Sequence, residues 1–149
     1  MRLRAETDVA APAGTVWRRL ADPAALEGAA TARGADVARL DGAGPVAPGA
    51  AWRIAFPFHG RPRSLTLRLT EVTAPETLSG VAEGEGLTGQ AVVKIDPATP
   101  EVTRVTATVD LGATGFQGRL LLQTLKLMRG TLEAKMQDRL DRFARRVGG

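Results

Sequence analysis

The side chains best suited to acid–base chemistry in this 149-residue sequence are one histidine and two nearby glutamates. His59 is the only histidine and lies in a run, Phe58 to Arg61, that indicates a hairpin tip, where a general base would lack a partner and shelter from water. Glu83 and Glu85 would share one face of a strand, because alternate strand residues point to the same side. Facing inward they would form an acid pair for proton transfer. We expect them instead to face outward as ordinary surface charges.

A glycine-rich run, Gly84 to Gly89, matches the G-x-G-x-x-G pattern of dinucleotide-binding loops. That mechanism needs a helix N-terminus directly after the glycines, to direct backbone N–H groups at a pyrophosphate. The residues that follow, Gln90 to Ile95, have the character of a strand. We therefore interpret the pattern as a hairpin turn, with a phosphate site as the alternative.

The composition excludes several reactive centres. There is no cysteine, so disulfides, thiolate metal sites and a cysteine nucleophile are excluded, and a single histidine makes a transition-metal site unexpected. The only serines, Ser64 and Ser79, do not lie in a nucleophile-elbow context. We assign no catalytic residue, no metal and no cofactor from the sequence.

The net charge of +4 is concentrated near the end of the chain. From Phe116 onward there are 8 Lys and Arg against 3 Asp and Glu, whereas the preceding 115 residues carry 12 against 13. We interpret the basic excess as the solvated face of an amphipathic helix, with an anionic partner as the alternative. Four Phe, two Trp and no Tyr offer few rings for base stacking, so no nucleic-acid partner is expected. No apolar run reaches the roughly 20 residues of a transmembrane segment, and a cytoplasmic location is the default expectation.

The length of 149 residues favours a single domain over residues 1–149, and the hydrophobic periodicity predicts that it is of the α+β class. Leu3 to Val9 is expected to form a strand, followed by a helix over Ala13 to Ala21 and a second short helix, capped by Asp22, through about Ala30. Apolar–polar alternation predicts six further strands: Asp36 to Leu40, Trp52 to Phe56, Leu65 to Thr70, Thr77 to Glu83, Gln90 to Ile95 and Val102 to Leu111. Their short connections favour an antiparallel meander.

Three arginines alternate with the apolar residues of three of these strands. We expect Arg53, Arg68 and Arg104 to lie on the solvent face of the sheet. If the sheet were inverted, they would line a cavity suited to a carboxylate.

The chain is predicted to end in one amphipathic helix, Phe116 to Val147, about 48 Å long. Its apolar stripe steps by three or four residues: Leu121, Leu125, Met128, Leu132, Met136, Leu140, Phe143 and Val147. Because Leu120, Leu122 and Leu127 widen the apolar arc of the first half, we expect that half to be enclosed and the second half to lie on the surface. Gly130 in mid-helix is attributed to close packing or drift, with a bend or room for a ligand as the alternative.

This order of elements resembles the START-related helix-grip (SRPBCC) superfamily, which includes polyketide cyclase/dehydrase-like proteins. Three motifs carry the similarity: Val9 to Pro12 followed by Val16, Trp17, Leu20 and Asp22-Pro23; Gly49 to Trp52 at the third strand; and Thr103-Arg104-Val105 at the last strand. The resemblance implies a curved antiparallel sheet of about seven strands wrapped round a long C-terminal helix, with two short helices after the first strand. It also implies a mostly apolar cavity between sheet and helix. Members bind lipids, sterols, polyketides or hormones, and some catalyse cyclisation or dehydration.

We therefore expect the chain to bind or transport a hydrophobic small molecule or lipid, without catalysis. The residues expected to line the cavity are apolar positions that face one another in this arrangement: Trp52, Ile54, Phe56, Leu65, Leu67, Leu69, Val93, Val105, Val109, Leu121, Leu125 and Met128. The same residues would also fill a solid core, where each stabilises the fold by about 1.5–3 kcal/mol. Small strand residues favour a cavity: Ala55, Gly80, Ala82, Ala91 and Ala107.

Two alternative functions remain open at this point. A cyclase or dehydratase would require Glu83, Glu85 or His59 to point into the cavity. An interaction module would bind a protein partner or a membrane surface through the basic C-terminal helix, using Lys135, Arg139 and Arg142.

Overall fold

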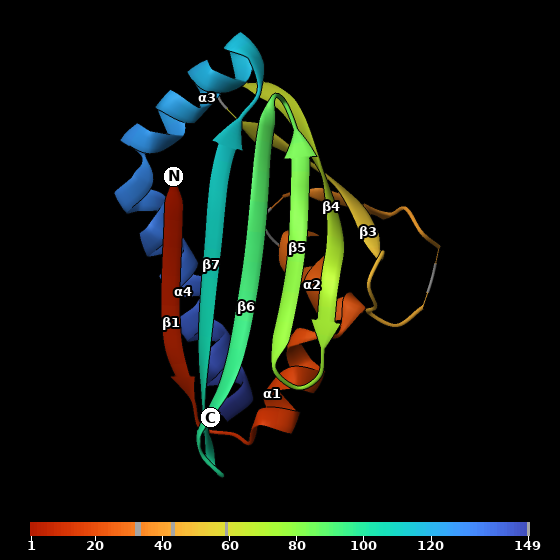
Figure 1. Cartoon of the computed structure of the whole chain (residues 1–149), viewed down its shortest axis with the longest axis vertical. Helices are drawn as coiled ribbons and strands as arrows, with labels where there is room; N and C mark the ends of the chain where they lie inside the picture. Colours follow the sequence, from red (N-terminus) through yellow and green to blue (C-terminus); the bar gives the residue numbers. More distant parts are fainter. Residues whose placement is uncertain (32–33, 43, 59, 149) are drawn as a thin grey trace.

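The computed structural model describes residues 1–31, 34–42, 44–58 and 60–148. Its elements follow the chain in the order β1 (Arg2–Val9), α1 (Ala13–Leu20), α2 (Pro23–Thr31), β2 (Asp36–Arg39), β3 (Ala51–Phe58), β4 (Arg61–Thr73), β5 (Thr77–Gly84), β6 (Leu87–Thr99), β7 (Val102–Ala113), α3 (Gly115–Leu127) and α4 (Arg129–Gly148). Figure 1 shows one curved sheet with the helices on one side of it. Each predicted strand and both short helices are present, and the predicted fold class is confirmed.

The strands form a single antiparallel sheet in the order β1-β7-β6-β5-β4-β3-β2. Each of the strands β2 to β7 pairs with its neighbours in the sequence, as the short connections predict. Strand β1 pairs with β7 and forms one edge of the sheet. The strands β4, β6 and β7 are longer than the sequence indicates, because their outer residues pair despite weak alternation. The sheet therefore presents two faces along nearly the whole length of these strands.

One face of the sheet is exposed and carries ion pairs between neighbouring strands. Arg53, Arg68 and Arg104 are all exposed, which confirms their predicted position on the solvent face. Arg104 Nε donates to Asp8 Oδ1 of β1 at 3.0 Å. The guanidinium lowers the pKa of the Asp8 carboxyl by this hydrogen bond.

The other face is covered in two places by apolar side chains. Val9, Val16, Ile95 and Val105 form one buried cluster beneath α1. A second cluster lies further across the sheet and contains Ala50, Trp52, Leu69 and Leu78. The partly buried side chains Trp17, Leu20 and Val93 pack against both clusters and so join them into one core.

The Thr-Arg pair at the start of β7 has a structural role at the corner where β1 leads into α1. The Thr103 side chain is fully buried and its Oγ1 donates to the Ala11 carbonyl at 2.7 Å. A buried carbonyl without such a partner would destabilise the fold by roughly 1–3 kcal/mol. Asp22 caps α2 as predicted, since its Oδ1 accepts the backbone N–H of Ala24 at 3.0 Å.

The glycine-rich run is a hairpin turn, as predicted. Gly84 pairs with Leu87, and the two residues between them, Glu85 and Gly86, have φ of 57° and 75°. Positive φ at both central positions is the geometry of a tight turn between antiparallel strands. The turn touches α3 closely: a Cβ on Gly86 would lie 2.8 Å from Gly118 Cα.

The C-terminal segment is not one helix, and this prediction was wrong. The chain leaves helical geometry at Met128, with φ −96° and ψ 8°, so α3 and α4 point in different directions (Figure 1). Close packing does not explain Gly130, because a Cβ there would meet no atom within 4 Å. A straight helix of about 48 Å would pass beyond a curved sheet, whereas two shorter helices follow it.

The predicted division of the C-terminal segment into an enclosed first half and a surface second half was also wrong. On α3, Phe116 and Leu127 are 70% and 90% exposed. On α4, Leu140, Phe143, Ala144 and Val147 pack against the core cluster beneath α1. The number of apolar residues on α3 did not decide its burial, because it is α4 that packs against the core and bonds to β1.

The helix α4 lies along the free edge of the sheet. Gln137 Oε1 accepts the backbone N–H of Glu6 at 3.2 Å, and Gln137 Nε2 donates to the Glu6 carbonyl at 2.7 Å. Glu133 Oε2 accepts the Arg4 N–H at 3.0 Å, and Asp141 Oδ1 accepts the Thr7 hydroxyl at 2.9 Å. Side chains of α4 thus occupy backbone groups that an edge strand would otherwise leave open.

Candidate ligand-binding site

An apolar cavity of about 200 Å³ lies between α2 and the inner face of the sheet. Carbon makes up nearly all of its surface. The lining residues come from α2 and from five strands: Leu26, Glu27, Val37, Trp52, Ile54, Leu67, Leu69, Leu78, Ser79, Gly80, Ala91 and Val93.

The floor of the cavity is built from cross-strand neighbours. Leu69, Gly80 and Ala91 stand opposite one another on β4, β5 and β6, so the large side chain faces two small ones. A Cβ on Gly80 would lie 3.3 Å from Leu67 Cδ1 and 3.4 Å from Leu69 Cδ2. Leu67 and Leu69 therefore pack closely over the bare backbone of Gly80, and Gly80 and the small Ala91 both line the cavity.

Ser79 also lines this cavity, but its side chain belongs to the other face. It pairs with Glu71 and Val92, whereas its neighbours Leu78 and Gly80 pair with residues of the inner face. Because successive strand residues point to opposite sides, we attribute its place in the lining to the backbone.

Among the described residues that line the cavity, one has a charged side chain, Glu27, and it is held by the indole of Trp52. Trp52 is 2% exposed, and its Nε1 donates to Glu27 Oε1 at 3.0 Å. This bond fixes one carboxylate oxygen of Glu27 at the cavity wall. Glu27 was missed by the sequence analysis, although it is the one ionisable residue of α2.

An ion pair that does not line the cavity also contacts the Trp52 ring. The Arg39 guanidinium lies 4.8 Å from the centroid of the Trp52 ring, within the range of a cation–π contact. Arg39 Nε donates to Asp41 Oδ1 at 2.6 Å, and that oxygen also accepts the Ala51 N–H at 3.1 Å. Together these hydrogen bonds lower the pKa of the Asp41 carboxyl to about 2.

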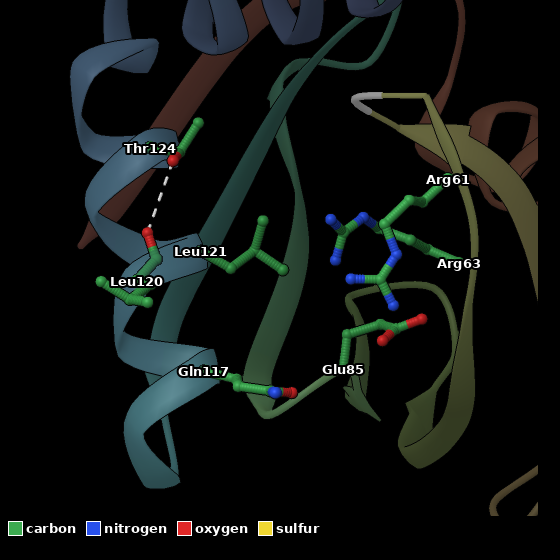
Figure 2. A pocket seen from close by; sticks show the side chains of 7 residues that line it. All are labelled: Arg61, Arg63, Glu85, Gln117, Leu120, Leu121 and Thr124. Carbon is green, nitrogen blue, oxygen red and sulfur yellow. Dashed lines mark hydrogen bonds between the residues drawn. The ribbon is translucent and has the colours of Figure 1, made fainter.

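A second pocket, of about 300 Å³, opens where α3 faces the ends of the strands. Figure 2 shows Arg61 and Arg63 extending from β4 towards α3, with Glu85 of the β5–β6 turn below them. The side contributed by α3 consists of Gln117, Leu120, Leu121 and Thr124. This pocket, unlike the first, is largely polar.

Of the twelve residues predicted to line a cavity, six line one of the two pockets. Trp52, Ile54, Leu67, Leu69 and Val93 line the apolar cavity, and Leu121 lines the second pocket. Val105 is fully buried in the core cluster beneath α1. The remaining five are not among the residues that line either pocket: Phe56, Leu65, Val109, Leu125 and Met128. The apolar cavity is bordered by α2, and not by the C-terminal segment as the sequence predicts.

The residues considered for catalysis do not reach the apolar cavity. Glu83 and Glu85 are exposed, as predicted, and Glu85 lies at the rim of the second pocket. His59 lies outside the described residues. Within the described ranges, no group of three or more His, Asp or Glu is placed to hold a metal ion.

The basic face of the C-terminal segment is solvent-exposed. Lys135, Arg139 and Arg142 are all exposed, and Arg142 pairs with Asp138 one turn earlier at 2.9 Å. A role in binding a partner stays a prediction. No described helix is both long and apolar enough to cross a membrane.

The fold is shared with several solved proteins. Norcoclaurine synthase from Thalictrum flavum, solved with dopamine and hydroxybenzaldehyde, matches with a TM-score of 0.71 and 15% identity over 99% of this chain and 86% of its own. A protein from Thermus thermophilus matches with 0.67 and 21% identity over 99% and 97%. The Zhui aromatase/cyclase from Streptomyces sp. R1128 matches with 0.60 and 20% identity over 78% and 70%. At these identities the likeness shows the fold alone.

No curated protein matches the chain. One family model, described as polyketide cyclase / dehydrase and lipid transport, matches residues 1–148.

Proposed function

This chain belongs to the polyketide cyclase/dehydrase and lipid transport family, and from that premise we propose that it binds a small hydrophobic molecule in the cavity beneath α2. The observation that carries the proposal is the nearly all-carbon lining of a partly open cavity next to one fixed carboxylate. An apolar molecule entering such a space is stabilised by about 25 cal/mol for each Å² of its apolar surface removed from water.

The size of the cavity limits the part of the ligand that it can hold. A dry apolar cavity of about 150 Å³ takes up benzene. A space of about 200 Å³ therefore suits a single ring, a pair of fused rings or a short branched chain. Glu27 would accept a hydrogen bond from a hydroxyl or amine on that group, because Trp52 Nε1 occupies only one of its oxygens.

The proposal is tested by filling the cavity. Ala91→Leu places a larger side chain opposite Gly80 and should weaken the binding of naphthalene about tenfold or more, measured by isothermal titration calorimetry. Val92→Leu adds bulk on the same strand but on the opposite face, and should leave the affinity unchanged. Naphthalene that fails to bind the unmodified protein, or binds all three proteins equally, would overturn the proposal.

A second candidate function is cyclase or dehydratase chemistry at the same cavity. The observation that favours it is the Glu27 carboxylate, a group able to move a proton, in an otherwise apolar lining. Mass spectrometry of the molecule carried by the purified protein and by its Glu27→Gln variant separates the two functions. The same molecule on both proteins indicates binding alone, whereas an unconverted precursor on the variant indicates catalysis.

A further inference from the structure

One face of β4 carries both the arginines of the second pocket and the leucines of the apolar cavity. Arg61, Arg63, Leu65, Leu67 and Leu69 occupy alternate positions, so their side chains point to the same side of the sheet. Leu67 and Leu69 line the apolar cavity, and Arg61 and Arg63 line the second pocket. At about 3.3 Å per residue, Arg63 lies roughly 13 Å along the strand from Leu67.

The second pocket has more positive than negative charge. Its described lining residues include two guanidinium groups and one carboxylate, that of Glu85. Within the part of the chain that the structure describes, neither arginine forms an ion pair with an acidic residue. Arg63 donates through Nε to the Phe58 carbonyl at 3.2 Å, which leaves its terminal N–H groups available. Figure 2 shows both arginine side chains extending from β4 into the pocket, above Glu85.

We infer that Arg61 and Arg63 bind the acidic head group of an elongated ligand whose apolar body lies along β4 towards the cavity beneath α2. The head group is a carboxylate or a phosphate ester, since the planar fork of a guanidinium forms paired hydrogen bonds with either. Leu65, between the two pockets on the same strand face, offers an apolar contact for the middle of the ligand. The inference rests on the proposed function, because the apolar end must enter that cavity.

Three probes that share one alkyl chain test the inference: decanoate, decyl phosphate and decanol. In the double variant Arg61→Gln/Arg63→Gln, calorimetry should show about tenfold or weaker binding of both anions, with decanol within twofold of its original affinity. Arg68→Gln is the matched control, because it removes the same charge from the same strand on the opposite, exposed face. Arg61→Gln alone repeats the test with a side chain that is exposed, should the double variant fail to fold.

The acidic residue at the pocket provides a test of opposite sign. Glu85→Gln removes the one carboxylate of the lining and should strengthen the binding of decanoate several-fold. The ratio of decanoate to decyl phosphate affinity identifies the head group.

The outcomes separate this inference from the proposed function. Anions that bind no better than decanol, or whose affinity is unaffected by the arginine variants, would overturn the inference while leaving the apolar cavity as a binding site. Failure of all three probes to bind would overturn the inference, and the naphthalene titration then decides separately whether the apolar cavity is a binding site.

Discussion

At the scale of single residues, Asp41 fixes the position of the cavity's aromatic wall. Its Oδ1 accepts hydrogen bonds from Arg39 Nε at 2.6 Å and from the Ala51 N–H at 3.1 Å. The Arg39 guanidinium in turn lies over the ring of Trp52. The positions of the end of β2, the start of β3 and the Trp52 indole therefore depend on one ionised carboxyl.

This dependence predicts a loss of stability in acid. The pKa of Asp41 is lowered to about 2 in the folded protein, below its ordinary value of about 3.9. A carboxyl whose pKa is lowered by folding stabilises the folded state at any pH above its ordinary pKa. That contribution disappears as the pH falls from about 4 to about 2. The melting temperature should therefore fall across this range, and Asp41→Asn should remove part of the fall. Equal slopes for the two proteins would contradict the assignment.

Residue types and their spacing predicted the strand residues of the cavity better than its polar group. Trp52, Ile54, Leu67 and Leu69 could be identified because period-two alternation assigns each strand residue to a face. Glu27 could not be identified in this way, because its role depends on how α2 lies over the sheet. The sequence of this nine-residue, alanine-rich helix does not indicate that placement.

At the scale of elements, α4 completes the sheet at β1. The Gln137 amide donates one hydrogen bond to the Glu6 carbonyl and accepts one from the Glu6 N–H, as the backbone of a neighbouring strand would. Its Nε2 also donates to Asp141 Oδ1 at 3.0 Å, which holds the amide in this orientation.

Replacing that amide should destabilise the protein more than its exposure suggests. Gln137→Glu keeps an acceptor for the Glu6 N–H but loses the donor to the Glu6 carbonyl, and brings a second carboxylate to Asp141. We expect a loss of roughly 1–3 kcal/mol in the free energy of unfolding, measured with urea at pH 7. Lys135→Ala, on an exposed position of the same helix, should change it by less than about 0.5 kcal/mol. An effect of Gln137→Glu no larger than that control would show that the edge contact is unimportant.

The same region shows where prediction from the sequence fails for elements. The apolar stripe continues through Met128 without a change of period, so nothing in its spacing indicates that the helix ends there. The second helix packs against residues far away in the chain, and such contacts cannot be read from the spacing within the helix. Local periodicity therefore predicted helix type correctly, but it did not predict helix direction or which half would be buried.

At the scale of the whole molecule, the stabilising contacts are unevenly distributed. The side chains of α4 pack against the core and bond to β1, whereas α3 rests on the β5–β6 turn through Gly118 and leaves Phe116, Leu120 and Leu127 exposed. Segments with few buried apolar contacts open at lower free energy than the core.

Hydrogen exchange should reveal this difference. The backbone amides of Gly115–Leu127 are expected to exchange faster than those of Arg129–Gly148, because α3 opens without separating α4 from the sheet. Mass spectrometry after timed exposure to deuterated buffer measures both segments in one experiment. Decanoate at saturating concentration should slow exchange in α3 more than in α4. Equal protection of the two helices in the free protein would contradict the expectation.

The break at Met128 also bears on how such a protein can evolve. Most substitutions cost stability, and a lineage keeps only those that leave the protein above the threshold for folding. Because α4 holds the sheet while α3 lines the second pocket, mutations of α3 can alter molecular preference at little cost to folding. Related proteins that have acquired new ligands are therefore expected to differ first between Gly115 and Leu127, whereas Arg129–Gly148 should change more slowly.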